Sequence, residues 1–501
     1  MARRLPWLCL TAYLLACTFW WVRRQWWPEW DSAIYILLGR SLAAGGGYAY
    51  LGEPFFLRPP GFPWLLSGVL GDGGLDGLSL NRLVMVFAGL LVAAVYFALR
   101  FRHSRALSLG VALLGGTSAM VVARFNRVES DFPFAALLFL GIGLLERARA
   151  RREDLAWGLA GAISIAAALH VRLVGVLLLP GLFGLALLRR GGASRARSLV
   201  PALVAAALAA PWLAYARWAA GLTPDPADQL LAFDYWTMLL RADPGDPGSP
   251  WLSIPEGIER VRRNSAGLFR LARATLGIES GWLGGLAVAF ALLGFARSLR
   301  APSLLEWFAG AYAALLLLWG AYIRLGLPLV HLFYLYLLLG VGDLAARLWR
   351  GRGRPELAGG LVAAGLAALN LASWREAGPP LWPEDLRSAK IEARWGVELE
   401  VAELIRAHTP PRAVILADNA PVLSLLTGRR VYTYRFGRRG NLMPRYRPDL
   451  IVVDVEEFSA PAFEEELRRS SRRRFKRSEE LSRGRLAVYE ARIPRRKRPA
   501  S

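Results

Sequence analysis

Residues 83–99 read LVMVFAGLLVAAVYFAL, a run without a charged side chain that stops at Arg100. About 20 consecutive, mainly apolar residues are needed to cross the hydrocarbon core of a bilayer as an α-helix. Apolar runs of similar character cover residues 173–188 and 312–322. The sequence therefore predicts an α-helical membrane protein that crosses the bilayer several times.

The composition agrees with this prediction and excludes other classes of protein. Of the 501 residues, 54% are hydrophobic and only 20% are charged, whereas soluble domains carry about 25% charged residues. A soluble enzyme, a disordered chain and a disulfide-rich scaffold are thereby excluded. Most of the net charge of +23 comes from arginines at the ends of apolar runs, where they anchor helices, so we expect no nucleic acid partner.

We predict about eleven membrane spans, the first of them an uncleaved helix. The arginines of the short loops are distributed unevenly, with nineteen on one side and four on the other. Because arginine-rich loops stay in the cytoplasm, the N-terminus is expected inside and, after an odd number of spans, the C-terminus outside. The predicted spans are residues 5–22, 80–99, 106–123, 132–146, 155–170, 173–188, 198–218, 279–296, 304–323, 327–346 and 356–374.

Three larger segments then face outward. Residues 23–79 and 221–278 are expected to be outer loops of a membrane part that comprises residues 1–375. Residues 376–501 are expected to form a small extracytoplasmic α/β domain with a basic tail, because helical spacing over 384–408 is followed by short β-type runs.

The first outer loop contains an amphipathic pattern over residues 31–44, with tryptophans just ahead of it. A helix with one apolar face in this position is expected to lie in the membrane interface. Asp31 opens the pattern and suits two roles. Its carboxylate could cap the first turn of the helix, or it could take part in chemistry.

The same loop continues to Arg58-Pro59-Pro60-Gly61, and the apolar residues that follow predict a second interfacial helix. The two prolines fix the backbone directly after Arg58. One interpretation is an arginine that snorkels at the start of a helix. The other is a rigidly presented guanidinium that grips a phosphate with two parallel hydrogen bonds.

A dense charge cluster occupies the next outer turn, residues 124–131 (RFNRVESD). Arg127 and Asp131 have the spacing of an ion pair across one helical turn. Arg172 and Arg324 each stand alone at the outer end of a pair of spans, where single arginines usually serve as anchors. Several such residues converging on one outer face would form an anion site.

These motifs, in this order, resemble those of the GT-C superfamily of membrane glycosyltransferases. They are similar to the branch that contains the bacterial protein O-mannosyltransferases and the lipid A aminoarabinose transferase, and the resemblance covers about the first 375 residues. The matching motifs are residues 31–35 (DSAIY) with 41–45 (SLAAG) and 47–48 (GY), 58–61 (RPPG), 130–134 (SDFPF), 172–175 (RLVG), and Arg324 with Pro328.

Two positions depart from the family pattern. Ser32 stands where the family often has a second acid, and Arg58 stands where it often has lysine. Asp31 alone can still act as a base. One carboxylate makes a poor site for a divalent cation, so we expect neither a divalent metal nor another cofactor.

The resemblance implies a hexosyl- or pentosyltransferase that works among membrane lipids at the outer face of the bacterial cytoplasmic membrane. It would move a sugar, with inversion, from a polyprenyl-phosphate donor to a hydroxyl group of a lipid, glycan or protein. The implied roles are general base for Asp31, orientation of acceptor or loop for Asp131, donor phosphate binding for Arg58, Arg172 and Arg324, and acceptor or loop contacts for Tyr35, Arg127 and Glu129.

The alternative is a transporter or flippase for a lipid-linked or anionic substrate. Such proteins usually place ionisable residues in the middle of their spans and often contain internal repeats. In this sequence nearly all charges lie at helix ends or in outer loops, and no convincing repeat is present. The charge pattern therefore favours chemistry at the membrane surface.

Overall fold

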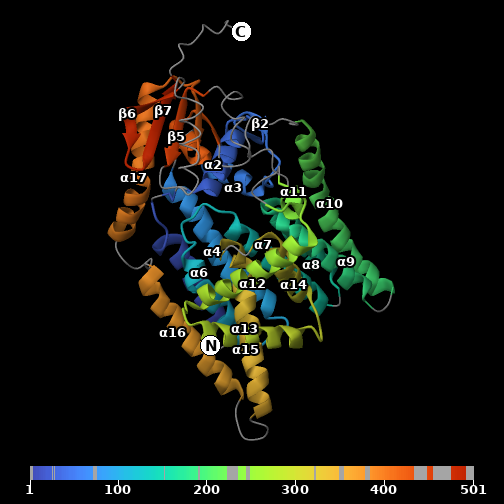
Figure 1. The fold of residues 1–501 in the computed structure, drawn as a ribbon. Coiled ribbons are helices and arrows are strands. Elements are labelled where there is room, and N and C mark those ends of the chain that lie inside the picture. Colours follow the sequence, from blue (N-terminus) through green and yellow to red (C-terminus); the bar gives the residue numbers. More distant parts are fainter. Residues whose placement is uncertain are drawn as a thin grey trace. The chain divides into compact units, whose positions relative to one another are not determined.

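The computed structural model of the chain, shown in Figure 1, forms two compact units. The first comprises Met1–Trp26, Arg58–Arg217 and Ser253–Pro383, and the second comprises Trp27–Leu57, Trp218–Leu252 and Glu384–Ser501. The second unit thus combines part of the first predicted loop with the C-terminal residues. The structure describes residues 4–24, 26–27, 29–70, 76–151, 153–189, 192–222, 235–243, 249–320, 323–348, 355–377, 384–433, 448–454 and 475–491.

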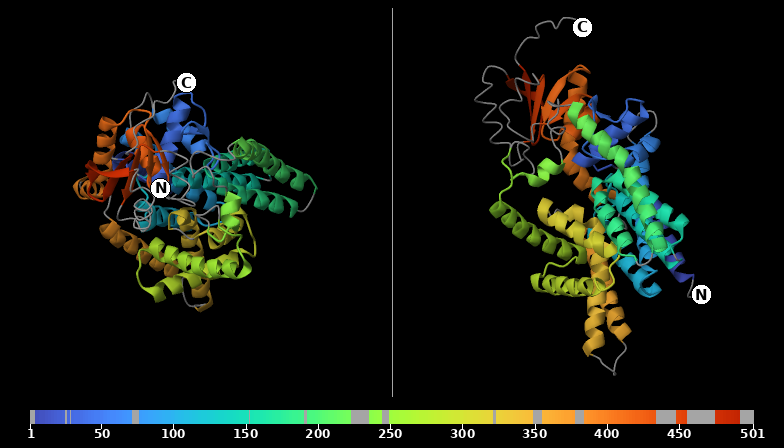
Figure 2. Two further views of the ribbon diagram at one scale, coloured as in Figure 1. Left: turned by 45° about the horizontal axis from the view of Figure 1, so that its top comes forward. Right: turned by 90° about the vertical axis from the view of Figure 1, so that its right-hand side faces the viewer.

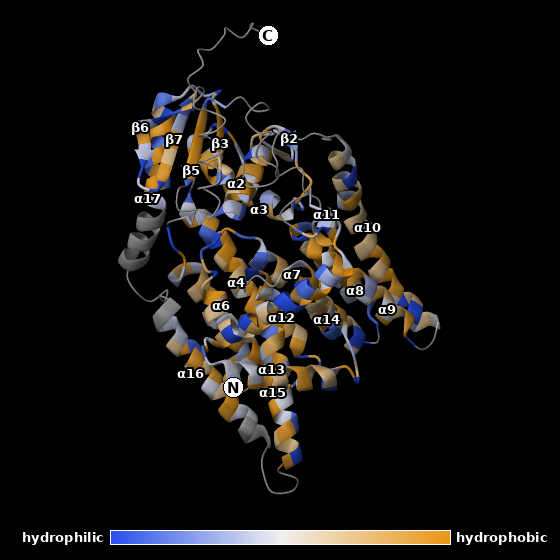
Figure 3. Ribbon diagram, in the orientation of Figure 1, coloured by the Kyte–Doolittle hydropathy of each residue, from blue (hydrophilic) through white to orange (hydrophobic). Residues whose placement is uncertain are grey.

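The first unit consists of helices, and Figure 3 shows that hydrophobic residues dominate most of them. The last residues of α10 fall in the second unit. The helices are α1 (Leu5–Leu15), η1 (Ala16–Trp20), α3 (Gly61–Leu70), α4 (Gly77–Leu99), α5 (Arg105–Gly116), α6 (Ala119–Val122), α7 (Asp131–Ala150), α8 (Leu155–Val171), η2 (Leu173–Leu177), α9 (Leu178–Leu187), α10 (Gly192–Leu222), α12 (Ile254–Leu276), α13 (Gly281–Ser298), α14 (Leu304–Trp319), η4 (Ile323–Gly326), α15 (Leu327–Leu348) and α16 (Pro355–Ala377).

Each of the predicted spans coincides with one or two of these helices. Within the described residues, four helices are long and apolar enough to cross a membrane, namely Gly77–Leu99, Gly192–Gly221, Gly281–Ser298 and Arg324–Leu348. Seven further apolar helices are shorter. The count of eleven spans and the orientation of the termini stay predictions.

Glycine allows two of the long helices to touch. A Cβ atom added at Gly294 in α13 would lie 2.0 Å from the Tyr336 carbonyl oxygen of α15, and one added at Gly340 in α15 would lie 2.0 Å from the Phe290 carbonyl oxygen of α13. Small residues are common where membrane helices pack, because they let two backbones approach closely. The α13–α15 contact is therefore a backbone contact that no larger side chain fits.

Buried polar side chains connect further helices of the first unit. Asn370 of α16 donates to the Leu114 carbonyl of α5 at 2.9 Å and accepts a 2.8 Å hydrogen bond from the Tyr334 hydroxyl of α15. The Trp374 indole donates to the Thr117 carbonyl at 2.7 Å. These bonds help to hold α16 against α5 and α15, and Figures 1 and 2 show α16 beside α15.

The C-terminal part of the second unit is built on a five-stranded sheet with the order β4-β3-β5-β7-β6. β4, β3 and β5 are parallel, whereas β7 runs antiparallel to β5 and β6. The predicted basic tail lies outside the described residues. The elements are α17 (Glu384–His408), β3 (Val414–Ala417), α18 (Ala420–Thr427), β4 (Arg430–Thr433), β5 (Leu450–Asp454), β6 (Phe475–Arg483) and β7 (Leu486–Ala491).

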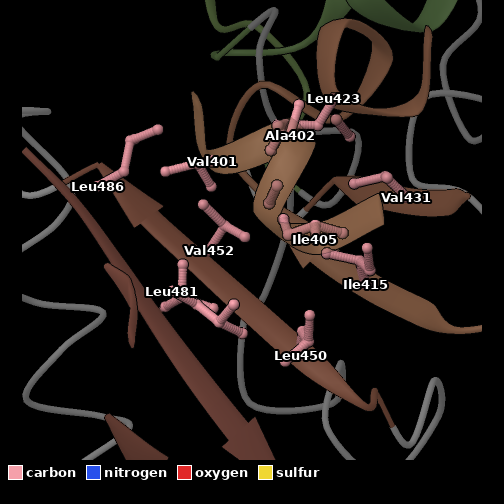
Figure 4. Close-up of a cluster of buried hydrophobic side chains, with 13 residues drawn as sticks. Val401, Ala402, Ile405, Ile415, Leu423, Val431, Leu450, Val452, Leu481 and Leu486 are labelled. Carbon is pink, nitrogen blue, oxygen red and sulfur yellow. The ribbon is translucent and has the colours of Figure 1, made fainter. Parts of the chain in front are cut away.

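The core of this sheet follows from the alternation of its strands. Ile415, Val431 and Val452 point from neighbouring strands to the face that α17 covers with Val401 and Ile405 (Figure 4). All five are at most 2% exposed. The helical spacing of residues 384–408 and the β-type runs after it therefore meet in one hydrophobic core.

The second unit also contains α2 (Trp30–Ala43) and a hairpin of β1 (Ala49–Tyr50) and β2 (Glu53–Pro54). Ile34 and Leu38 of α2 are fully buried against Tyr50 and Phe55, and α2 also packs against α18. The amphipathic pattern of residues 31–44 thus reflects packing against protein. The expectation of a lipid-facing surface for this helix is corrected accordingly.

Replacing Gly340 by Ala should lower the midpoint of thermal unfolding of the purified protein by several degrees. The added methyl group would overlap a backbone carbonyl, which no rotamer change can relieve, and overpacking a tight contact costs about 1–3 kcal/mol. Gly342→Ala is the matched control, since a Cβ atom at Gly342 of the same helix meets nothing within 4 Å. Equal unfolding midpoints for the two variants would contradict the backbone contact.

Candidate functional site

A short loop between α6 and α7 is fixed to the N-terminal segment by one asparagine. Asn126 accepts a 2.8 Å hydrogen bond from the Arg23 backbone N–H and donates a 3.0 Å hydrogen bond to the Trp21 carbonyl. Asn126 has φ 61°, a left-handed conformation that asparagine tolerates better than most residues. Asn81 donates to the Arg23 carbonyl at 3.0 Å. The loop that carries the predicted charges therefore has a defined position.

Five charged residues meet beside this loop, and we call them the arginine–carboxylate cluster: Arg124, Glu129, Asp131, Arg172 and Arg324. Asp131 forms an ion pair with Arg172. Glu129 lies 3.5 Å from the Arg124 guanidinium and 3.8 Å from that of Arg324. Glu129 and Asp131 are only 3% and 4% exposed, so their charges depend on these arginines for compensation.

Arg172 follows directly after α8, where the backbone turns to an extended conformation before η2. Gly175 allows η2 to fold back, since a Cβ atom there would lie 2.9 Å from the Leu169 Cα. The Trp307 indole of α14 donates to the Leu177 carbonyl at 2.7 Å. The position of Arg172 is thus set by the break between α8 and η2.

Arg324 lies in the single turn η4 between α14 and α15. The Tyr312 hydroxyl of α14 donates a 2.6 Å hydrogen bond to the carbonyl of the neighbouring Leu325. The Arg324 side chain is 39% exposed, whereas that of Arg172 is 19% exposed. Of these two arginines, Arg324 therefore has the more accessible side chain.

Arg58 precedes α3, and Gly61 holds the start of that helix against α8. A Cβ atom at Gly61 would lie 2.6 Å from the His170 carbonyl oxygen and 3.2 Å from the Val171 nitrogen. His170 and Val171 are the last residues of α8, directly before Arg172. The Arg-Pro-Pro-Gly motif is therefore attached to the same helix end that carries Arg172.

Asp31 lies in the first turn of α2, but Glu29 caps this helix. The Glu29 side chain accepts a hydrogen bond from the Ser32 backbone N–H, and the Glu29 backbone N–H donates to the Ser32 hydroxyl at 3.2 Å. The capping role that the sequence allowed for Asp31 belongs to Glu29. Ser32, which replaces the second acid of the family pattern, is fully buried in this capping box.

The remaining predicted residues have different environments. Tyr35 of α2 is buried at 6% exposure, and the Arg127 Nε donates to the Ala123 carbonyl at 3.1 Å. Asp31 and Tyr35 belong to the second unit, whereas the predicted arginines, Glu129 and Asp131 belong to the first. Among the described residues, no three His, Cys, Asp or Glu side chains group as metal ligands; independence from metal stays a prediction.

Comparison with known proteins supports the resemblance inferred from the motifs. Residues 57–216, about a third of the chain, match the family model for dolichyl-phosphate-mannose-protein mannosyltransferase. This matched range contains Arg58, Glu129, Asp131 and Arg172. No curated protein sequence matches the chain.

Solved structures show the same fold. ArnT from Cupriavidus metallidurans in the apo state is 14% identical with a TM-score of 0.59, covering 98% of this chain and 99% of that one. ArnT bound to undecaprenyl phosphate is 14% identical with a TM-score of 0.57, covering 98% of both chains. The oligosaccharyltransferase of Archaeoglobus fulgidus is 13% identical with a TM-score of 0.57, covering 90% of this chain and 68% of that one. The predicted resemblance to the GT-C superfamily is confirmed, and the chain has an ArnT-like, mainly helical membrane-protein fold.

Proposed function

We propose that the chain is a glycosyltransferase that moves a sugar from a polyprenyl-phosphate donor to a hydroxyl acceptor. The observation that carries this proposal is the arginine–carboxylate cluster, in which buried acids pair with Arg172 and Arg324. Gly61 of the Arg58 motif packs against the helix end that directly precedes Arg172. The family match over this region and the binding of undecaprenyl phosphate by ArnT support the same function. The sugar of this donor is proposed to be a hexose or a pentose.

The arginines would bind the phosphate that leaves with the lipid. Bidentate pairing suits guanidinium and phosphate, and positive charge fixed in advance stabilises the negative charge that develops on the leaving group. In this proposal Asp131 and Glu129 act through the arginines. By pairing with Arg172 and Arg324, they hold the guanidinium groups ready for the phosphate.

Asp31 would serve as the general base. The acceptor oxygen forms a bond to the anomeric carbon while its proton passes to the Asp31 carboxylate, and the bond from that carbon to the phosphate oxygen breaks. A single displacement of this kind inverts the anomeric centre. Glu29 and Ser32 form the capping box of α2, so this box does not require the Asp31 carboxylate. The reaction is proposed to need no divalent metal.

The proposed setting is the outer face of a bacterial cytoplasmic membrane, with the N-terminus in the cytoplasm and residues 376–501 outside. The acceptor would be a lipid, a glycan or a protein. A transporter for a lipid-linked anion is the alternative from another class of function. The arginine–carboxylate cluster lies in loops and at helix ends, which suits surface chemistry better than a translocation path.

Asp31→Asn should lower the rate of sugar transfer by about 10²–10⁴-fold, the usual contribution of general acid–base catalysis. The variant should fold normally, because the capping box formed by Glu29 and Ser32 stays intact. The measurement is transfer by purified protein from lipid-linked sugars extracted from the host membrane.

Asp76→Asn is the matched control for this experiment. Asp76 also lies at the start of a helix, where its side chain accepts a hydrogen bond from the Leu78 backbone N–H at 3.0 Å. Its variant should transfer sugar at nearly the wild-type rate. A folded Asp31→Asn protein with full activity would remove Asp31 from the mechanism.

Arg58→Ala should weaken binding of polyprenyl phosphate by about 10- to 100-fold, since hydrogen bonds to charged groups contribute about 1.5–3 kcal/mol. Arg58→Lys should retain part of the affinity, because a point charge still attracts the phosphate. Native mass spectrometry of the purified protein with added lipid measures this. The control is Arg82→Ala, which removes an exposed arginine from α4; equal affinities for both alanine variants would make Arg58 a membrane anchor.

A further inference from the structure

The second unit contains a cavity of about 270 Å³ that the proposed mechanism does not use. It opens at the carboxyl ends of the parallel strands β3 and β5, with contributions from α17, from the start of β7 and from the start of α2. The volume is close to the lower limit of small-ligand pockets, about 300 Å³. The lining residues are Glu29, Trp30, Trp395, Glu398, Ala417, Asp418, Asn419, Leu423, Val452, Asp454, Arg485 and Leu486.

The cavity lies at a switch in the strand order of the sheet. β3 has β4 on one side and β5 on the other, and all three strands are parallel. The chain therefore leaves β3 toward one neighbour and later adds β5 on the opposite side. In open α/β sheets, ligands bind outside the carboxyl ends of strands at such a switch in strand order.

The charged residues that line the cavity restrict the chemical class of ligand that can bind there. Among the residues that the structure describes, four carboxylates and one arginine line the cavity. Arg485 pairs with Glu398 and lies 3.3 Å from the Asp454 carboxylate. A phosphate or carboxylate placed in the cavity would face acceptor oxygens, which cannot donate hydrogen bonds to it, so this wall favours a ligand that donates hydrogen bonds.

Two residues that line the cavity each carry a buried oxygen without a hydrogen-bond donor among the described residues. Glu398 is only 4% exposed, and its Oε2 has no hydrogen-bond partner among the residues that the structure describes. The buried Asn419 Oδ1 likewise has no partner within the described part of the chain. Burial raises the pKa of Glu398, and Arg485 opposes that shift. A buried acceptor without a hydrogen bond lowers the stability of the folded protein. The hydroxyl groups of a bound ligand could donate the missing hydrogen bonds.

Aromatic residues complete the cavity. Trp30 and Trp395 contribute indole rings, whose flat apolar faces suit the C–H faces of a sugar ring. Carboxylate and amide oxygens beside aromatic rings form a chemical set that matches a polyhydroxylated ring without acidic groups. A phosphate-bearing donor head group does not fit this set.

We propose that this cavity binds a sugar ring of the acceptor, uncharged or amine-bearing, and this assignment rests on the proposed glycosyl transfer. Glu29 and Trp30 line the cavity and directly precede Asp31 in the same first turn of α2. A sugar held there lies next to the helical turn that carries the proposed base. The cavity would thus select the acceptor, whereas the arginines of the first unit would select the donor.

Saturation-transfer NMR on the purified full-length protein tests this assignment with a panel of neutral, amine-bearing and uronic methyl glycosides as probes. Glu398→Gln and Asn419→Ala should each weaken binding of the neutral or amine-bearing probes by about tenfold, the effect of losing one hydrogen bond to a charged or buried group. Glu400→Gln, an exposed position of the same helix that pairs with Arg483 at 2.6 Å, should bind like the wild type.

Several outcomes would overturn the proposal: no binding by any neutral or amine-bearing probe, equal binding in all variants, or preference for the uronic probes. Sugar transfer by the same samples keeps the two proposals separate. Glycoside binding that depends on Glu398 and Asn419 in a protein that transfers no sugar would support the sugar cavity and contradict the proposed function. In an active enzyme, Glu398→Gln should raise KM for the acceptor and leave KM for the lipid donor unchanged.

Discussion

The ion pair between Asp131 and Arg172 joins the first residue of α7 to the residue that follows α8. Removing a carboxylate and a guanidinium from water is costly, and the cost is recovered only if the two groups pair well. Glu129 is under the same constraint with Arg124 and Arg324. Pairing therefore dictates where the loop, the break after α8 and the turn η4 must lie, and it leaves fixed positive charge at the end of an apolar helical unit.

Small residues let the backbone come close enough for this arrangement. Gly61 brings the start of α3 against the last residues of α8, and Gly175 lets the chain turn back directly after Arg172. Asn126 accepts a left-handed conformation and binds the N-terminal segment to the charged loop. Close backbone contact and buried charge together bring the start of α3, the end of α8 and the paired arginines into one region of the first unit, and the proposed function depends on this arrangement.

The helices of the first unit could be predicted from the sequence, because the length of an apolar run indicates a membrane span and arginine-rich loops mark the ends of such spans. The helices indeed cover the predicted spans. The pairing of Arg172 with Asp131 could not be anticipated, because their sequence separation is large and Arg127 offered a local partner. A polar turn containing asparagine was the one local signal for Asn126.

The first outer loop shows where a pattern admits two explanations. Its apolar spacing fits a membrane surface as well as a protein surface, and only tertiary contacts show that Ile34 and Leu38 pack against Tyr50 and Phe55. Likewise, the sequence allows Asp31 either to cap the helix or to take part in chemistry, and only the structure shows that Glu29 and Ser32 form the capping box. Residues from α2, α17 and the sheet line the cavity of the second unit. They are far apart in the sequence, so no single sequence motif predicts the cavity.

The most direct test of sugar transfer is a reaction in detergent solution with purified protein, extracted lipid-linked sugars and cell-envelope acceptor, with and without excess EDTA. A transporter has no second compartment in detergent and can form no product there. The account predicts that mass spectrometry will detect free polyprenyl phosphate and a new sugar–acceptor bond in equal amounts, at the same rate with EDTA. Unchanged lipid-linked sugar would contradict the transferase function, and product lost with EDTA would contradict the metal-free mechanism.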